Sequence, residues 1–309
     1  HIRFTGAGAG LNVWAPSSSA LAFNRVSFLA TTGTSQVDYN GGGGNSCSFK
    51  TLSFASNGII YNNHYFSDTL KFSPDYSYLL QAGGTQSFSA TGVLDATGTC
   101  NSFIAIGSTA SGTQAVISKP SDSINVNFVQ LSDNNAEATG AAYNALNTID
   151  LDNNTGWTTI TSPDPRDLYW VGGNGNWNDP ARWSTWDNGA PGACIPTPSD
   201  NVFFTINSGT PLTVIINIPN AYCKNMTWTA TQGPTFTSTA TTNILNIYGS
   251  LTLISAMNFA GGAWPVYFRS TNPAGETITS DTRTFPGEIY FTGNGGSWTL
   301  NDALSVASS

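Results

Sequence analysis

The segment ILNIYGSLTL, residues 244–253, belongs to a series of short strand-like segments in the second half of the chain. The others are NVFFT (201–205), CKNMTW (223–228), PVYF (265–268) and EIYFT (288–292). The centres of all five segments are Phe203, Met226, Ile247, Tyr267 and Tyr290, which lie 23, 21, 20 and 23 residues apart. Short strands at such a spacing, joined by Gly-, Asn-, Thr- and Pro-rich turns, are typical of coils that stack on one another. We therefore predict an all-β parallel β-solenoid (β-helix).

The alternative fold is a set of antiparallel β-sandwich modules. A sandwich needs hairpins, and Asn-Gly or Asp-Gly turns every 8–12 residues are the sequence signal that predicts them. Only three Asn-Gly pairs of this chain flank apolar runs. The spacing of the strand-like segments therefore favours the solenoid, in which each coil buries its inner face against its neighbours.

The composition supports a β protein and excludes some partners. The chain has 309 residues with 10 Lys and Arg, 18 Asp and Glu, a net charge of −8 and only 9% charged residues. Its polarity comes from Ser, Thr, Asn and Gly, and only residues 134–146, which include Gly140, have a helical composition. We expect no nucleic acid binding, which requires clustered Lys and Arg. No apolar run is long enough for direct membrane insertion.

The first half of the chain is less regular. Phe4, Phe28, Leu52 and Phe72 are separated by 24, 24 and 20 residues. Region 14–150 therefore fits the solenoid with more variation and could hold a divergent inserted module. In INVNFVQLS, residues 124–132, apolar residues alternate with asparagines that we expect to face outward or to stack as a ladder.

An internal repeat and a proline-rich segment indicate the domain organisation. IRFTGAGAGLNV (2–13) matches IYFTGNGGSWTL (289–300) at an offset of 287 residues. TSPDPRD (161–167) contains two prolines and no apolar residue. We predict that residues 1–160 are the end of one solenoid repeat unit, 161–167 a linker and 168–309 the start of the next unit. The chain would then be a segment of a longer protein.

The four cysteines predict disulfides. Cys47, Cys100, Cys194 and Cys223 form no CxxC pair, and with only two histidines in the chain a zinc site is not expected. Four cysteines in a charge-poor chain indicate an oxidising compartment. Of the three pairings we favour Cys47–Cys100 and Cys194–Cys223, which keep each bridge within one half. The alternative is four buried thiols.

Catalytic motifs are weak, so we predict that the protein is not an enzyme. No GxSxG motif occurs, His64 has no evident partner, and the sequence does not bring Glu276 and Glu288 together as a glycosidase pair. A calcium site is the best metal hypothesis, because Asp150, Asp152 and Asn154 alternate ahead of Gly156. The alternative for this segment is an Asx turn in which these side chains bind their own backbone.

The segment DLYWVGGNGNWNDPARWSTW (167–186) contains four of the nine tryptophans. One interpretation is a capping segment that covers the first coil of a solenoid, whose apolar cross-section and strand edge must be hidden. The other is a carbohydrate-binding module in which aromatic rings stack on sugars. Its candidate residues are Tyr169, Trp170, Trp177, Trp183 and Trp186. The position of the segment, between the linker and the regular strands, favours the cap.

Several motifs resemble the repeat units of giant adhesin-like surface proteins of gliding Bacteroidota, which the type IX secretion system exports. The resemblance is carried in order by LDNNTGW, DLYWVGGNGNWNDPARWS, GACIPTPSDNVFF, YCKNMTW, LNIYGSLTL, GETITS and IYFTGNGGSWTL, and covers most of residues 150–300. It implies serial solenoid repeats, an extracellular cell-surface location and roles in attachment or gliding. It supplies no catalytic residue and no cofactor.

The resemblance also implies partners and a modification. The partners would be neighbouring repeats of the same polypeptide, surface glycans or the secretion and motility machinery. Such bacteria O-glycosylate Asp-Ser/Thr-apolar sites, which here are Thr69 and Ser123.

The leading functional hypothesis is a rigid stalk, filament or surface adhesin. The first alternative is a carbohydrate-binding module that uses residues 169–186, and the second is a β-helix polysaccharide lyase or hydrolase.

Overall fold

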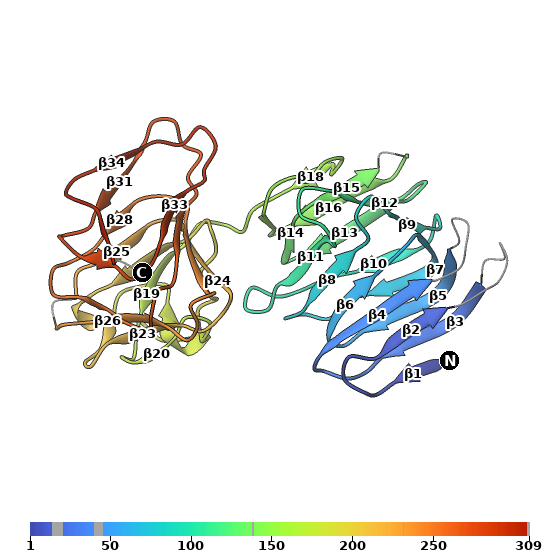
Figure 1. The fold of residues 1–309 in the computed structure, drawn as a ribbon, viewed down its shortest axis with the longest axis horizontal. Helices are drawn as coiled ribbons and strands as arrows, with labels where there is room; N and C mark the ends of the chain where they lie inside the picture. The colour runs from blue at the N-terminus through green and yellow to red at the C-terminus, as the bar shows by residue number, and fades with distance from the viewer. Residues whose placement is uncertain (14–20, 40–45, 138, 231, 308–309) are drawn as a thin grey trace. The chain divides into compact units, whose positions relative to one another are not determined.

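The computed structural model describes residues 1–13, 21–39, 46–137, 139–230 and 232–307. These residues form two compact units, His1–Pro163 (unit 1) and Asp164–Ser309 (unit 2). The division lies within the segment 161–167 that the sequence predicts as a linker. Each unit is a parallel β-solenoid, as Figure 1 shows by its side-by-side strands, so the predicted fold class is confirmed and the sandwich alternative is wrong.

Two sheets run along unit 1, and neighbouring strands in each belong to successive coils and are parallel. The strands of the first sheet are, in order, β1 (Ile2–Phe4), β3 (Leu21–Phe28), β5 (Cys47–Phe54), β7 (His64–Lys71), β9 (Thr85–Phe88), β12 (Ala115–Ser118) and β15 (Asn134–Glu137). Those of the second are β2 (Gly10–Val13), β4 (Thr34–Tyr39), β6 (Asn57–Ile60), β8 (Ser77–Leu80), β11 (Ile104–Ser108), β14 (Val129–Leu131) and β17 (Ile149–Asp150).

A third side develops in unit 1 where the long strands divide. The register between β5 and β7 shifts between Phe49 and Thr51, as at a β-bulge. The first half of β7 then pairs with β9, and its second half pairs with β10 (Val93–Asp95). The third sheet consists of β13 (Ser123–Asn127), β16 (Ala142–Leu146) and β18 (Thr159–Ile160).

Unit 2 has three sides from its second coil onward. The first sheet contains β21 (Trp183–Ser184), β19 (Asp167–Trp170), β22 (Asn201–Phe204), β25 (Met226–Trp228), β28 (Leu251–Thr252), β31 (Glu276–Thr279) and β34 (Trp298–Leu300). The second contains β20 (Gly175–Asn176), β23 (Thr213–Ile216), β26 (Thr235–Ser238) and β29 (Asn258–Phe259). The third contains β24 (Asn220–Cys223), β27 (Ile244–Ile247), β30 (Val266–Phe268) and β33 (Ile289–Phe291). A two-stranded sheet pairs β32 (Thr284–Phe285) with β35 (Ser305–Val306), and η1 (Pro180–Arg182) and η2 (Ile206–Ser208) are single 3₁₀ turns.

The segment 244–253 contains a corner of the solenoid. Ile244–Ile247 forms β27 on one side and Leu251–Thr252 forms β28 on the next. Gly249 lies in the corner, where an added Cβ would come within 2.3 Å of Asn225 Oδ1. The five segments therefore do not form one column as their even spacing predicts, because Phe203 and Met226 belong to the first sheet whereas Tyr267 and Tyr290 belong to the third.

The cores are built from side chains that stack on their equivalents one coil away. In unit 1, Phe23, Phe49, Phe66 and Phe88 form a column with ring centroids 5.4, 5.8 and 5.2 Å apart. In unit 2, Phe204 stacks on Trp228 at 3.9 Å. Such columns bury apolar surface at every coil boundary, and apolar burial is the main favourable term in folding.

Polar side chains form ladders on the outside of the coils. Asn144 Nδ2 donates to Asn125 Oδ1 at 2.8 Å, which confirms the expected asparagine ladder. The described residues of the segment 134–146 form β15 and β16 and no helix. Its weak helical composition is overruled because Ala136, Tyr143 and Ala145 are buried at strand positions of the solenoid.

Candidate functional site

The tryptophan-rich segment closes the first coil of unit 2. After β19 the chain passes through β20 and η1 and returns as β21, which pairs antiparallel with β19 and places Trp170 opposite Trp183. The outer edge of β19 is therefore occupied by a strand of the same segment. An antiparallel return of this kind hides the hydrogen-bonding groups that the end of a solenoid would otherwise expose.

Trp170, Trp177 and Trp183 fill the space beneath this edge. All three are fully buried, and the rings of Trp170 and Trp177 lie edge to face with Trp183 at 5.1 and 5.2 Å. Trp183 Nε1 donates to the Trp177 carbonyl oxygen at 2.9 Å, so this buried polar group is satisfied. A buried ring cannot stack on a sugar, so assigning carbohydrate binding to these three residues is incorrect.

The other two candidate aromatics differ in exposure. Tyr169 is half-buried and stacks on Phe203 of the next coil at 4.8 Å. Trp186 is 61% exposed. Of the five predicted sugar-stacking residues, Trp186 alone presents most of its surface to solvent.

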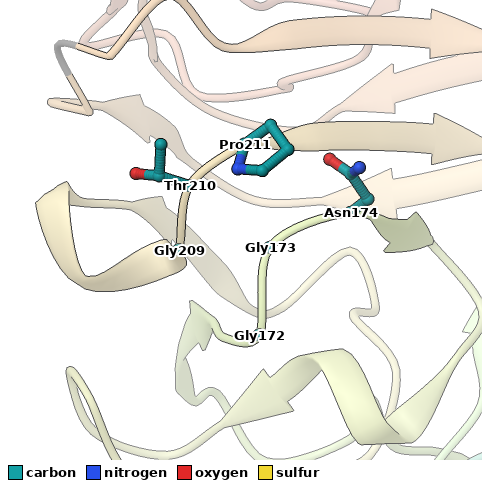
Figure 2. A pocket seen from close by; sticks show the side chains of 6 residues that line it. All are labelled: Gly172, Gly173, Asn174, Gly209, Thr210 and Pro211. Atoms are coloured by element: carbon teal, nitrogen blue, oxygen red, sulfur yellow. The ribbon is translucent and has the colours of Figure 1, made fainter.

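A shallow cup of about 410 Å³ lies beside the cap (Figure 2). It is formed by two loops, Gly172–Asn174 and Gly209–Pro211, and only Asn174, Thr210 and Pro211 contribute side chains. The loops touch through their backbones, because Gly173 N donates to the Ser208 carbonyl oxygen at 2.7 Å and a Cβ on Gly209 would lie 2.5 Å from Gly173 N. The lining offers peptide, amide and hydroxyl groups without an ionisable side chain, so it can form hydrogen bonds but supplies no carboxylate, imidazole or amine.

A second depression, of about 300 Å³, lies at the other end of unit 2 and includes Tyr267, Glu288 and Tyr290. The two tyrosine rings stack at 4.5 Å, and the Arg269 guanidinium lies 4.8 Å from the Tyr267 ring centroid. The Tyr290 hydroxyl donates to Glu288 Oε2, and this hydrogen bond raises the pKa of Tyr290.

The two glutamates considered as a glycosidase pair have separate partners. Glu276 accepts hydrogen bonds from Ser250 and Ser270, whereas Glu288 accepts from Tyr290. These contacts hold Glu276 against its own and the preceding coil.

The predicted calcium residues make hydrogen bonds to one another and to the backbone. Asn154 Nδ2 donates to Asp150 Oδ1 at 2.6 Å, and the Asp152 amide donates to the same oxygen at 3.2 Å. Asn154 Oδ1 accepts from the Asn134 amide at 3.0 Å. This pattern is that of the Asx turn. Among the described residues, no group of three His, Cys, Asp or Glu side chains is arranged to hold a metal ion.

The cysteines do not pair as predicted. Cys100 and Cys194 are disulfide-bonded, whereas Cys47 and Cys223 are free and buried. Both Cys47–Cys100 and Cys194–Cys223 are therefore wrong, because each combines a bonded cysteine with a free one. Cys47 and Cys223 point into the cores of their coils, where burial raises the pKa of the Cys47 thiol to about 11 and stabilises its protonated form.

His64 lies directly beside Cys47 in the neighbouring coil. Its Nδ1 accepts from the Cys47 amide at 3.1 Å, and burial lowers its pKa to about 4. The imidazole is therefore neutral at physiological pH and belongs to the core, at the first position of β7.

The predicted O-glycosylation residues both lie on strands. Thr69 is half-buried in β7 and donates to Asp68 Oδ1 at 2.9 Å, and Ser123 begins β13, where its hydroxyl accepts from Asn125 Nδ2 at 2.8 Å. Modification of either stays a prediction.

The apolar ends of the two solenoids were missed by residue-level reasoning. On the last coil of unit 2, the exposed fractions of Tyr290, Phe291, Leu300 and Val306 are 37, 47, 48 and 45%. On the first coil of unit 1 and the adjoining start of β3, those of Ile2 and Leu21 are 38 and 37%. The signal that could have found them is the match between residues 2–13 and 289–300, which places related sequences at the two ends.

Comparison with known proteins gives no relative. No protein family matches the chain, and neither a curated protein nor a solved structure is significantly similar. Among the described residues, no helix is both long and apolar enough to cross a bilayer.

Proposed function

We propose that the chain is a structural and adhesive segment of a large extracellular repeat protein, a rigid stalk or surface adhesin that supports attachment or gliding. The stacking of parallel coils in both units carries this proposal. Each interior coil is hydrogen-bonded on both edges and packed against both neighbours, so bending or pulling it loose disrupts two interfaces at once.

The surface chemistry and the cysteines support the proposal. Polar ladders such as Asn125–Asn144 and Asn201–Asn225 connect adjacent coils with few charged groups. Disulfide-bonded Cys100 and Cys194 are typical of proteins outside the reducing cytoplasm. The resemblance to adhesin-like Bacteroidota repeats adds the expectation of display on the cell surface and of attachment.

Two measurements on the complete chain test the proposal. Single-molecule pulling should give discrete unfolding events for the two solenoids, and beads coated with the chain should resist detachment from polysaccharide-coated glass under flow. Labelling of intact producing cells with an antibody should place it outside. Smooth extension like a flexible polymer, together with detachment equal to that of beads coated with an inert acidic protein, would contradict it.

Glycan binding is a second candidate, favoured by the exposure of Trp186 beside the cap. Asp187 next to it holds Thr205 and Asn207 through hydrogen bonds of 2.7 and 2.9 Å, so the adjacent backbone is fixed. A glycan array should then give a signal that Trp186→Ala removes without loss of thermal stability. A signal that Trp186→Ala leaves unchanged, or no signal from the wild-type chain, would reject this candidate.

A further inference from the structure

Basic residues recur at the coil spacing along one sheet of unit 1. Arg3, Arg25, Lys50 and Lys71 are separated by 22, 25 and 21 residues. They lie on β1, β3, β5 and β7, which are parallel neighbours in that order (Figure 1). Stacking of the coils therefore gathers on one sheet four basic residues that the sequence scatters.

The strand register places these residues on the outer face of the sheet. Arg3 and Lys71 occupy one column, in which Ser27 and Ser53 lie between them. Arg25 lies two residues before Ser27, and alternate residues of a strand share a face. All four basic residues are exposed, whereas the positions between them on β3 and β5 belong to the core. We call this surface the basic face and define it by Arg3, Arg25, Lys50 and Lys71.

Lys50 lies where the register between β5 and β7 shifts. Phe49 before it and Leu52 two residues after it are both buried. Lys50 and Thr51 therefore both face outward, and a hydroxyl group lies next to the ammonium group.

A shallow depression of about 260 Å³ occupies this part of the basic face. It is lined by His1, Asn24, Arg25, Lys50 and Thr51. Arg25 pairs with Thr51, so the two cations of the lining belong to adjacent coils. The depression combines these cations with amide, hydroxyl and imidazole groups, which together can bind an anionic group and the hydroxyl groups next to it.

Most of the positive charge on the basic face is unpaired. Lys71 forms an ion pair with Asp95, but the ion pairs among the described residues include none of Arg3, Arg25 and Lys50. These three side chains are therefore available to an external anion.

The surrounding sequence carries little negative charge. Residues 1–72 contain four Lys and Arg and two Asp, which gives +2, although the complete chain carries −8. The segments 14–20 and 40–45, which lie outside the described residues, contain no charged residue. One of the two aspartates, Asp68 on β7, accepts a hydrogen bond from the Thr69 hydroxyl at 2.9 Å. The start of unit 1 is thus a positive region in an acidic protein.

We propose that the basic face binds an acidic polysaccharide. Its carboxylate or sulfate groups pair with Arg25 and Lys50, and its hydroxyl groups form hydrogen bonds with Asn24 and Thr51. Neighbouring strands lie about 4.8 Å apart, which is close to the length of one sugar residue. A chain of sugars that runs along the stacking direction therefore meets a new coil, and on this face a new polar or basic group, at each residue.

The density of charge favours a polysaccharide over a nucleic acid. A DNA duplex carries one charge per about 1.7 Å of its axis, so three free cations neutralise little of it, and the net charge of −8 repels the rest. A polysaccharide with at most one acidic group on each sugar matches the sparse cations and also uses the hydroxyl and amide groups between them.

The inference deepens the proposed function by naming the chemistry of the surface that is contacted, and it rests on that function. The test is titration of the complete chain with polygalacturonate, with the fully methyl-esterified polymer as the uncharged control. We expect binding of the acid that weakens as the NaCl concentration rises, because salt screens exposed charges, and no binding of the ester. Dextran sulfate and dextran form a second pair. Tighter binding in the first pair assigns carboxylate as the preferred group, and tighter binding in the second assigns sulfate.

Single substitutions locate the site. Arg25→Gln and Lys50→Gln each remove one cation from the depression and should weaken binding about tenfold. Both residues are exposed, so thermal unfolding should stay unchanged in these variants. Lys224→Gln is the matched control, because it removes the same charge from an exposed position in unit 2 and should bind as the wild type does.

Four results would overturn the inference. They are failure of the wild type to bind either acidic polymer, equal binding of polygalacturonate and its methyl ester, an equal loss of affinity in Lys224→Gln, and tighter binding of a DNA duplex than of both acidic polymers. The proposed function would survive each of them if pulling still gave discrete unfolding events and coated beads still held to dextran-coated glass. Smooth extension, together with detachment equal to that of beads coated with an inert acidic protein, would instead remove the proposed function.

Discussion

The two ends of unit 2 are built from the same kind of coil and finish differently. At the first coil, β21 turns back and pairs antiparallel with β19, and three buried tryptophans fill the cross-section. At the last coil, the outer edges of β33 and β34 pair with no described strand, and Phe291 and Leu300 are exposed.

The comparison shows what closes a solenoid. Parallel stacking has no natural limit, because each coil presents the next with the same edge and the same apolar inner face. An end becomes a cap only where the chain reverses direction and large side chains replace the missing coil. The last described coil of unit 2 has neither of these features.

Removal of a capping tryptophan should give the largest effect. Trp183→Ala deletes a fully buried ring and leaves the Trp177 carbonyl without its donor, so we expect a loss of about 3–5 kcal/mol in the free energy of unfolding. Denaturant titration followed by tryptophan fluorescence measures it, since seven of the nine tryptophans lie in unit 2.

Trp186→Ala is the matched control for the cap. Trp186 belongs to the same segment but is mostly exposed, so its removal should change stability by less than about 0.5 kcal/mol. Equal losses in the two variants would show that burial in the cap does not close this end.

Loss of the carboxylate that anchors the first coil of unit 2 should have the next largest effect on the free energy of unfolding. Asp200 is fully buried and accepts from Arg166 Nε and Nη2 at 2.8 and 2.7 Å and from the Thr197 amide at 2.7 Å. Asp200→Asn leaves the guanidinium unpaired, and we expect a cost of about 2–4 kcal/mol in the same titration.

Asp95→Asn provides the comparison for that ion pair. Asp95 binds Lys71 on the surface of unit 1, where water screens both charges, so its loss should cost below about 1 kcal/mol. Similar costs for both variants would mean that the buried pair does not hold the coil.

Acid should destabilise unit 1 through the buried His64, because unit 2 contains no histidine. Burial lowers the pKa of His64 from 6.5 to about 4, so the folded state keeps this imidazole neutral while the unfolded chain protonates it. The stabilisation is complete above pH 6.5 and is lost as the pH falls toward 4, on the order of 2–3 kcal/mol.

The variant His64→Gln isolates this effect. Unfolding of unit 1 in the variant should lose its extra pH dependence between 6.5 and 4, while unfolding of unit 2, which contains no histidine, should be unaffected. An unchanged pH slope in the variant would exclude His64 as the cause.

The solenoid fold could be predicted from the sequence because every coil repeats the same local pattern of residues. Segments such as NVFFT and EIYFT each place apolar residues at alternate positions, and a step of roughly two dozen residues is visible without coordinates. It does not show where corners fall. ILNIYGSLTL reads as one strand, and the break at Gly249 depends on the close approach of Asn225 from the coil before it.

Part of the candidate site could also be predicted from the sequence. The capping role of residues 167–186 follows from their place between a linker and regular coils. The cysteine pairing could not be found, because which thiols meet depends on the path of the whole chain. The exposed row at Tyr290 and Phe291 was hidden because a residue on a terminal coil has the same sequence pattern as one inside the stack.

The smallest effect is expected at the open end, and it isolates the role of position within a column. Phe268 and Phe291 stack in one column, but Phe268 is fully buried one coil inside, whereas about half of Phe291 is exposed. Phe268→Ala should cost about 3–5 kcal/mol, whereas Phe291→Ala should cost below about 1 kcal/mol because no described coil covers its outer face. Denaturant titration of the two variants against the wild-type chain measures both costs. Equal costs would show that the position of a ring within the column does not decide how much it stabilises unit 2.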